Sequence, residues 1–249
     1  MSRVRCVYVT WHRTIPYSTV PYHTVSYPAA GTHGKAYLTL SLSKKARGKE
    51  EKVLLQSNCS LYRVTTKEEL DSFSCGDEDL DDFFHQEACL YDGQLLGKTY
   101  FFASERSGKD EIVCAFTLAN DSIKAALIPN ASRNKIQRKI PNSKRTRSYP
   151  AVLIGRLGVA KNFQGTNDGI GSQAIDYIIS WFLLPDNKTG CRFIVVDAYN
   201  KENVLRFYGK NGFKFLYSTE ELEKEANHIP DDEHLESRMM YLDLLGYIR

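Results

Sequence analysis

The fold of this chain is decided by one stretch, which reads Gly155-Arg-Leu-Gly-Val-Ala-Lys-Asn-Phe-Gln-Gly-Thr-Asn-Asp-Gly-Ile-Gly-Ser172. Apolar residues over 151–159 predict a buried strand, and apolar residues recur at helical spacing from Ile170 to Phe182. The Gly-rich turn between them leaves backbone N–H groups free at the positive end of a helix, where a phosphate or diphosphate binds. The spacing matches neither a dinucleotide fingerprint nor a P-loop. A tight turn between two buried elements is the plain structural alternative.

A second motif follows about forty residues downstream and reads Asp197-Ala-Tyr-Asn-Lys-Glu-Asn-Val-Leu-Arg-Phe-Tyr-Gly-Lys-Asn-Gly-Phe213. The order strand, Gly loop, long helix, strand and short helix ending in Phe-Tyr-x-x-x-Gly-Phe resembles the GNAT family of acetyl-CoA-dependent N-acetyltransferases. The resemblance covers about residues 60–245. It implies a mixed α/β fold, with a central, mostly antiparallel sheet and helices on both faces. It also implies an acyltransferase that uses acetyl-CoA.

Three further segments resemble one GNAT branch in particular, the toxins of bacterial toxin–antitoxin pairs that acetylate the amino group of aminoacyl-tRNA. This likeness implies aminoacyl-tRNA as the acceptor substrate. It also implies a small DNA-binding antitoxin as a partner, and a homodimer, for which nothing in the sequence specifies an interface. The segments are Phe73-Ser-Cys-Gly-Asp-Glu-Asp-Leu-Asp-Asp-Phe-Phe84, Leu96-Gly-Lys-Thr-Tyr100 and Leu153-Ile-Gly-Arg-Leu-Gly158.

The resemblance implies two groups of residues that bind acetyl-CoA, one at the end of the first strand and one in the loop behind it. The strand end offers backbone groups to the pantetheine arm and the thioester carbonyl, and the loop holds the diphosphate. In this chain the loop departs from the family pattern, because two extra residues separate Gln164-Gly165 from Gly169-Ile-Gly171, and Asp168 brings a negative charge. The implied cofactor-binding residues are Leu157, Gly158, Val159, Gln164, Gly165, Thr166, Gly169, Ile170, Gly171 and Ser172, with Asn200 and Asn203 from the second motif.

Tyr208 is the catalytic residue that the resemblance implies, since it matches the tyrosine that protonates the departing thiolate. A phenol with a pKa near 10 can donate to such a thiolate if a pocket aligns the two groups. The structural alternative is a core aromatic residue with a satisfied hydroxyl. No histidine is placed as a convincing general base, which favours an α-amine as acceptor, because roughly a tenth of an α-amine is neutral at pH 7. Asn200 and Asn203 have helix capping as their alternative role.

Positive charge is concentrated in one block, since no acidic residue occurs from Ser122 to Asn167. Such a block inside a folded domain is a plausible contact surface for a polyanion, and a solvated insert is the alternative. Arg156 is expected to face the acceptor, or otherwise to form a surface ion pair. The residues expected to contact the acceptor are Arg156, Arg138, Lys139, Lys144 and Arg145.

The overall composition indicates the class of protein, its compartment and its domain boundaries. A chain of 249 residues with 42% hydrophobic residues predicts a globular domain, and no apolar run reaches the length of a membrane span. The six scattered cysteines form no metal-ligand pattern and indicate thiols in a reducing compartment, the cytoplasm. Residues 1–57 hold a near-repeat with prolines and predict an extended or disordered extension, so the acetyltransferase domain is expected over 58–249.

Two other functions stay open from the sequence alone. One is a GNAT acetyltransferase of a small amine or a protein N-terminus, for which the basic block would be incidental. The other is a non-catalytic module that binds acyl-CoA, which the altered loop spacing at 164–171 keeps in consideration.

Overall fold

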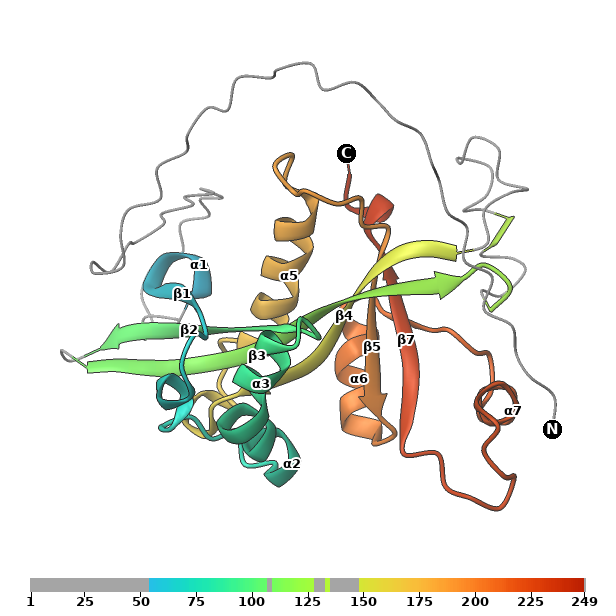
Figure 1. Cartoon of the computed structure of the whole chain (residues 1–249), viewed down its shortest axis with the longest axis horizontal. Coiled ribbons are helices and arrows are strands. Elements are labelled where there is room, and N and C mark those ends of the chain that lie inside the picture. The colour runs from blue at the N-terminus through green and yellow to red at the C-terminus, as the bar shows by residue number, and fades with distance from the viewer. Residues whose placement is uncertain (1–53, 107–108, 128–132, 135–147, 249) are drawn as a thin grey trace, which may run out of the picture. The chain divides into compact units, whose positions relative to one another are not determined.

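The computed structural model describes residues 54–106, 109–127, 133–134 and 148–248, all within one compact unit of the chain (Figure 1). Its first half contains α1 (Leu55–Asn58), β1 (Cys59–Arg63), η1 (Lys67–Leu70), α2 (Glu78–Asp82), η2 (Phe83–Glu87), α3 (Ala88–Gly93), β2 (Lys98–Arg106) and β3 (Lys109–Lys124). Its second half contains β4 (Ser148–Val159), η4 (Lys161–Phe163), α5 (Ile170–Leu183), β5 (Phe193–Tyr199), α6 (Glu202–Lys210), β6 (Lys214–Phe215), α7 (Glu220–Asn227), β7 (Ser237–Asp243) and η5 (Leu244–Gly246).

The strands form one seven-stranded sheet in the order β1-β2-β3-β4-β5-β7-β6. The pairs β1–β2, β2–β3, β3–β4, β5–β7 and β6–β7 are antiparallel, and β4–β5 is parallel. A parallel pair needs a crossover connection, and α5 supplies it here. The mixed, mostly antiparallel sheet predicted from the sequence is therefore confirmed.

One face of the sheet, which we call the α5 face, packs against helix α5. Tyr100 and Phe102 lie on this face of β2, two residues apart, as the period of a strand requires. The ring centroids of Tyr100 and Trp181 are 4.9 Å apart, and those of Phe102 and Tyr177 are 5.0 Å apart. In Figure 1 this helix lies above β2 and β3. These aromatic contacts fix α5 to the strands that precede the site.

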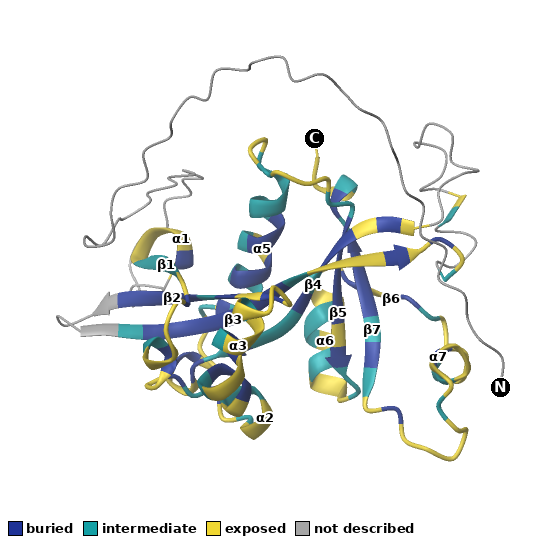
Figure 2. Ribbon diagram, viewed as in Figure 1, coloured by how far each residue is buried: buried dark blue, intermediate teal, exposed yellow. Residues whose placement is uncertain are grey.

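The opposite face, which we call the α2 face, is covered by the continuous helical segment 78–93. Gly158 of β4 faces it so closely that an added Cβ would lie 3.1 Å from the Phe73 ring and 3.2 Å from the Phe84 ring. The Arg156 guanidinium lies 4.9 Å from the centre of the Phe83 ring, a cation–π contact. Helices on both faces, as predicted, leave the central strands buried on both sides, as Figure 2 shows for β3 and β5.

The helical segment 78–93 begins directly after a capping aspartate, Asp77. The Asp77 carboxylate accepts a hydrogen bond from the Leu80 N–H at 3.2 Å, which caps the first turn. The segment is not one regular α-helix, because residues Phe83–Glu87 form a π-helical turn between α2 and α3. This irregular turn places Phe83 and Phe84 side by side against the sheet, with ring centroids 5.6 Å apart.

The described residues begin slightly before the predicted domain boundary at residue 58. Leu54 is the first described residue, and α1 includes Leu55, whose side chain is fully buried. The Leu55 N–H also donates to the side-chain oxygen of Gln173 in α5 at 2.9 Å. Residues 55–57 therefore belong with the folded domain, because burial of this leucine ties them to α5. The rest of the predicted extension, residues 1–53, lies outside the described residues.

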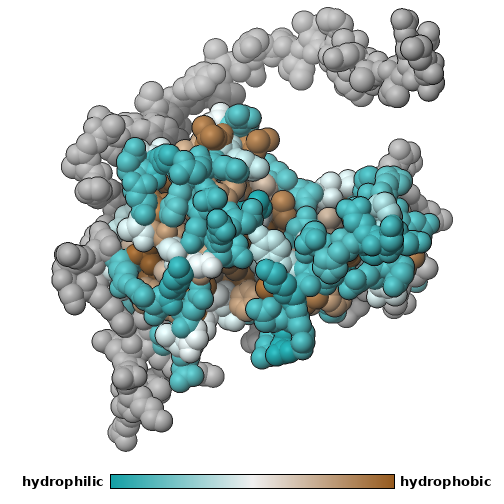
Figure 3. All heavy atoms as spheres, turned by 90° about the horizontal axis from the view of Figure 1, so that it is seen from below, coloured by the Kyte–Doolittle hydropathy of each residue, from teal (hydrophilic) through white to brown (hydrophobic). Residues whose placement is uncertain are grey.

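The surface seen from below is mostly hydrophilic, with separate apolar patches (Figure 3). Several exposed apolar side chains belong to α3 and the turn after it, and Leu95 there is 89% exposed. Among the described residues, no helix is both long and apolar enough to cross a membrane.

Replacement of Gly158 by alanine tests the close packing of the α2 face. We expect Gly158→Ala to lower the free energy of unfolding by about 1–3 kcal/mol, because Phe73, Phe84 and the backbone must shift to admit a methyl group. Urea denaturation followed by circular dichroism measures the change. Gly209→Ala in α6 is the matched control, since an added Cβ there meets nothing within 4 Å. Equal stabilities of the two variants would contradict this packing.

Candidate active site

The candidate site lies where two neighbouring strands separate. β4 and β5 pair over four residues, from Ala151 opposite Phe193 to Ile154 opposite Val196. Beyond that point β4 continues to Val159 paired only with β3, and β5 continues to Tyr199 paired only with β7. The two strands therefore diverge and leave a gap in the middle of the sheet.

A β-bulge in β4 marks the point of separation. In the register with β3, Arg156 lies opposite Thr117 and Ile154 lies opposite Leu118, so Gly155 has no partner. A bulge inserts one residue and re-aims the strand that carries it. On the side of the gap, the backbone N–H and C=O groups at the ends of β4 and β5 therefore form no hydrogen bonds with a neighbouring strand.

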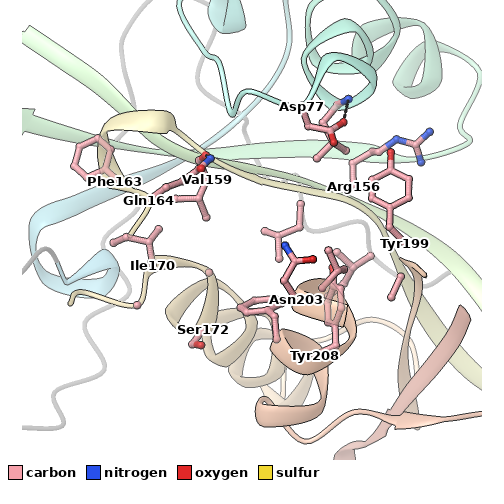
Figure 4. A pocket seen from close by; sticks show the side chains of 18 of the residues that line it. Asp77, Arg156, Val159, Phe163, Gln164, Ile170, Ser172, Tyr199, Asn203 and Tyr208 are labelled. Atoms are coloured by element: carbon pink, nitrogen blue, oxygen red, sulfur yellow. Dashed lines mark hydrogen bonds between the residues drawn. The ribbon is translucent and has the colours of Figure 1, made fainter. Parts of the chain in front are cut away.

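A cavity of about 670 Å³ lies in this gap, and residues from both faces of the sheet line it. Figure 4 shows Asp77, Arg156 and Tyr199 at one end of the cavity and Ser172 and Tyr208 at the other. The first end belongs to the α2 face, because Asp77 caps α2 and the Tyr199 hydroxyl bonds to Asp79 of the same helix. The second end belongs to the α5 face. Two molecules could thus enter from opposite faces and meet in the gap.

The start of α5 forms the wall of the cavity on the α5 face. Gly169 precedes the helix with φ 64°, a left-handed conformation that favours glycine, and the helix has no side-chain cap. Its first N–H groups therefore point toward the cavity without a protein side chain on them, at the positive end of a 14-residue helix. Gly171 must be small as well, because an added Cβ would lie 3.0 Å from the Phe207 ring of α6. This wall is suited to an anion such as a diphosphate.

The two extra residues in the loop before α5 do not obstruct this wall. Gly165 and Thr166 line the cavity, and so do the residues from Gly169 onward, whereas Asn167 and Asp168 do not. Gly165 has φ 67°, and the Asp168 carbonyl oxygen accepts a hydrogen bond from the Gln173 side chain at 2.8 Å. The residues Asn167 and Asp168 are therefore not part of the cavity wall, and neither is the negative charge that Asp168 brings.

Gln164 lines the cavity, but its side chain serves to hold the site together. Its amide nitrogen donates to the carbonyl oxygens of Cys75 at 2.6 Å and Val159 at 2.7 Å. Lys161 N–H donates to the Ser74 carbonyl at 3.0 Å, which links the same two segments. These bonds fix the end of β4 to the segment before α2.

Tyr208 projects from α6 into the cavity. Its ring packs between Phe207 and Phe213, with centroid distances of 5.0 and 5.3 Å. The hydroxyl makes no hydrogen bond to any other described residue, so it is available to a ligand. Burial raises the pKa of Tyr208 to about 12, because the phenolate would lose its hydration. The phenol therefore keeps its proton at neutral pH and can act as an acid.

The end of the cavity on the α2 face carries one cation among several carboxylates. Arg156 donates from one guanidinium nitrogen to the Gly155 carbonyl at 2.9 Å, while its buried Nε has no partner among the described residues. Asp197 follows the last β5 residue that pairs with β4. Burial and the nearby Asp121 carboxylate raise the pKa of Asp197, and Arg156 acts in the opposite direction.

A short hydrogen bond joins the two sides of this entrance. The Tyr199 hydroxyl donates to an Asp79 carboxylate oxygen at 2.6 Å and so connects the end of β5 to α2. Burial, followed by this bond to Asp79, raises the pKa of Tyr199 to about 12. Both effects favour the protonated phenol, so the bond persists at neutral pH.

Most of the predicted site residues come together at this cavity. Those that line it are Arg156, Leu157, Val159, Gln164, Gly165, Thr166, Gly169, Ile170, Gly171, Ser172, Asn203 and Tyr208. Gly158 does not line it, because that position of β4 points to the α2 face and packs on Phe73 and Phe84. Asn200 does not line it either, since its side chain donates to the Leu235 carbonyl at 2.9 Å. Arg138, Lys139, Lys144 and Arg145 lie outside the described residues.

Sequence reasoning missed the residues of the α2-face entrance, namely Asp77, Asp79, Asp197 and Tyr199. The first two lie in the segment Phe73–Phe84, which was quoted only for its resemblance. Asp197 and Tyr199 alternate at the end of an apolar strand, a pattern that indicates polar side chains on one face just past the core. That signal was available and could have identified them. None of the described histidines lines the cavity.

Comparisons with known proteins agree with this geometry. No family model matches the chain. Over 140 residues the chain is 28% identical to a tRNA-acetylating toxin of Mycobacterium tuberculosis. The aligned region covers 56% of this chain and 75% of the toxin. A crystal structure of a KacT mutant matches 76% of this chain and 97% of its own at a TM-score of 0.55 and 16% identity. The structure of AtaT complexed with acetyl-methionyl-tRNAfMet matches 77% of this chain and 98% of its own chain, at a TM-score of 0.53 and 19% identity.

The structural matches establish the fold, which is that of the GNAT acetyltransferases, as the sequence resemblance implied. The relative of known activity is a toxin, which agrees with the predicted branch of that family.

Removal of the Asp79 carboxylate tests the entrance on the α2 face. Asp79 is an anionic acceptor that stabilises the protonated phenol, so Asp79→Asn should lower the pKa of Tyr199 from about 12 toward the ordinary value near 10. Carbon NMR of the phenolic Cζ in labelled protein, assigned with Tyr199→Phe, follows this titration.

Asp82→Asn serves as control, because Asp82 is exposed on the same helix and does not line the cavity. A Tyr199 pKa that does not move in Asp79→Asn would show that the two side chains do not interact.

Proposed function

We propose that this chain is an N-acetyltransferase that transfers acetyl from acetyl-CoA to the α-amino group of aminoacyl-tRNA. The observation that carries the proposal is the cavity between β4 and β5, which joins an anion-binding helix start on one face to an acidic entrance on the other. The similarity to a tRNA-acetylating toxin supports the choice of acceptor. The solved complex of AtaT with acetyl-methionyl-tRNAfMet supports the proposal as well, because a protein of this fold binds an acetylated aminoacyl-tRNA there.

The residues of the α5 face fit acetyl-CoA. The uncapped N–H groups at the start of α5 and the flexible backbone at Gly169 would hold the diphosphate. The edge of β4 that no longer pairs with β5, at Leu157 and Val159, would hold the pantetheine arm by backbone hydrogen bonds, much as a neighbouring strand would. Asn203 lies between these two parts of the cavity wall and offers an amide. Bound there, acetyl-CoA supplies an activated acyl group as its thioester.

The chain's own residues then orient the acceptor and supply a proton. The neutral amine of the acceptor attacks the thioester carbonyl, a C–N bond forms, and the C–S bond breaks. The amine gives up its proton to solvent, and the Tyr208 hydroxyl donates a proton to the departing sulfur. The pKa of about 12 for Tyr208 keeps that proton in place before the reaction. The same lack of hydration raises the proton affinity of a thiolate formed beside it, which favours the transfer.

An α-amine suits this site better than a lysine side chain, because no histidine of the described part of the chain lines the cavity to remove a proton. Roughly a tenth of an α-amine is already neutral at pH 7, against a far smaller fraction of lysine. The basic residues between β3 and β4 would contact the phosphate backbone of tRNA, and such contacts weaken steeply as salt rises. A small DNA-binding antitoxin, a homodimer and a cytoplasmic location belong to the same proposal by resemblance.

The direct test is acetyl transfer with purified protein. Labelled acetyl-CoA is supplied with a panel of aminoacyl-tRNAs, with deacylated tRNA, with free amino acids and with a peptide. The proposal requires label on at least one aminoacyl-tRNA and none on deacylated tRNA. Transfer only to the peptide or to free amines would favour the other acetyltransferase hypothesis. Binding of acetyl-CoA without any transfer would favour a non-catalytic module.

Tyr208→Phe tests the proton donor. We expect kcat to fall by about 10²–10³-fold, the usual range for loss of a general acid, while the Kd for acetyl-CoA stays within about threefold. The affinity is retained because the ring contacts with Phe207 and Phe213 remain. Single-turnover kinetics and calorimetry provide the two values. Tyr91→Phe is the control, as this exposed tyrosine of α3 does not line the cavity. Turnover of Tyr208→Phe within twofold of the unaltered chain would rule out this role.

A further inference from the structure

The acidic end of the cavity contains three carboxylates, and their hydrogen bonds distinguish them. Asp77 accepts from the Leu80 N–H at 3.2 Å, and Asp79 accepts from the Tyr199 hydroxyl at 2.6 Å, so both already serve the protein. Asp197 also lines the cavity, yet its carboxylate makes no hydrogen bond or ion pair with any described residue. Of these three carboxylates, only that of Asp197 has no partner among the described residues.

The position of Asp197 is fixed by the strand that carries it. Ala198 beside it is buried, and Val196 before it is buried as well, so the backbone of β5 is held on both sides of Asp197. Because side chains alternate along a strand, Asp197 shares the α2 face with Tyr199, whose hydroxyl is bonded to α2. Asp197 lies one residue beyond Val196, the last β5 residue paired with β4. The carboxylate therefore stands where an acceptor arriving from the α2 face would reach the gap.

We propose that Asp197 binds the α-amino group of the acceptor and selects a cationic amine for entry into the gap. This inference rests on the proposed acetyl transfer and names the residue that recognises its acceptor. A carboxylate and an ammonium group form a charge-assisted hydrogen bond, which is shorter and about twice as strong as a neutral one. Arg156 across the gap repels the ammonium and so keeps it on the Asp197 side.

The charges around Asp197 agree with this role. Asp121 of β3 and Asp77 and Asp79 of α2 add negative charge, and Arg156 is the cation among them. An entrance with this balance attracts an ammonium group and disfavours an acceptor that presents a free carboxylate. The Asp197 side chain is itself exposed. Desolvation, and after it Asp121, raises the pKa of Asp197, and Arg156 acts in the opposite direction. The bound ammonium first loses a proton to solvent, and the neutral amine then attacks. Acetylation leaves a neutral amide, so the contact with Asp197 is lost when the product forms and release is favoured.

Asp197→Asn tests the proposal with a side chain of nearly the same shape. Because a charge-assisted bond is replaced by a neutral one, we expect KM for the aminoacyl-tRNA that is the best acceptor to rise about 10-fold. The Kd for acetyl-CoA should stay within about twofold, and the melting temperature should not fall. Asp82→Asn is the matched control, since Asp82 is an exposed carboxylate of α2 that does not line the cavity and should leave KM within twofold.

A change in the substrate completes the test. Nitrous acid converts the amino group of the same aminoacyl-tRNA to a hydroxyl, and the affinities of both forms are measured without acetyl-CoA. The unaltered chain should bind the amine form about 10-fold more tightly, and Asp197→Asn should lose this preference. A merely structural role of Asp197 would weaken both forms equally.

Three outcomes would overturn the inference. One is a KM in Asp197→Asn within twofold of the unaltered value, and the second is a preference for the amine that persists in this variant. In both cases the proposed function stands, because the unaltered chain is active. The third is an unaltered chain that acetylates no aminoacyl-tRNA, which contradicts the proposed function together with the role of Asp197.

Discussion

The separation of β4 from β5 is the constraint on which the rest of the structure depends. Four paired residues hold the two strands together, and beyond Ile154 and Val196 each strand stays with its other neighbour. A sheet interior is normally closed, because unpaired backbone groups are costly when they are buried. Here the opening is tolerated since the strand ends line a cavity, where a ligand can take up the free groups. The gap thus connects the two faces of the sheet through one cavity.

The surroundings of the gap maintain the separation. On the α5 face, Gly171 lets α5 approach the Phe207 ring of α6, so the two helices meet behind the opening. On the α2 face, the hydrogen bond from Tyr199 to Asp79 and those from the Gln164 side chain connect the strand ends to α2 and the segment before it. Each strand end is thereby held by a helix or loop where a neighbouring strand would otherwise lie.

Much of the fold and of the cofactor end of the site could be predicted from the sequence. The apolar run before Gly155, the helical spacing from Ile170 and the Phe-Tyr-x-x-x-Gly-Phe motif are local signals, and each lies where the structure has the corresponding strand or helix. The gap itself could not be predicted this way, because strand register depends on pairing between distant segments.

The entrance on the α2 face, where the acceptor is proposed to bind, depends on contacts between distant segments even more than the cofactor end does. Asp79 and Tyr199 are 120 residues apart, and nothing local indicates that they are bonded. Gly158 was predicted to bind the cofactor and does not line the cavity. It lies in the middle of the expected cofactor motif, but its Cα faces Phe73 and Phe84. The bulge at Gly155 accounts for part of this, because one inserted residue changes which side chains of β4 face the cavity.

A crystal structure of the chain with acetyl-CoA bound is the measurement that tests the central claim most directly. The account predicts the diphosphate within hydrogen-bonding distance of the N–H groups at the start of α5, and the thioester in the gap between β4 and β5, with its sulfur next to the Tyr208 hydroxyl. Acetyl-CoA bound elsewhere, or a gap closed by continued pairing of β4 with β5, would contradict it.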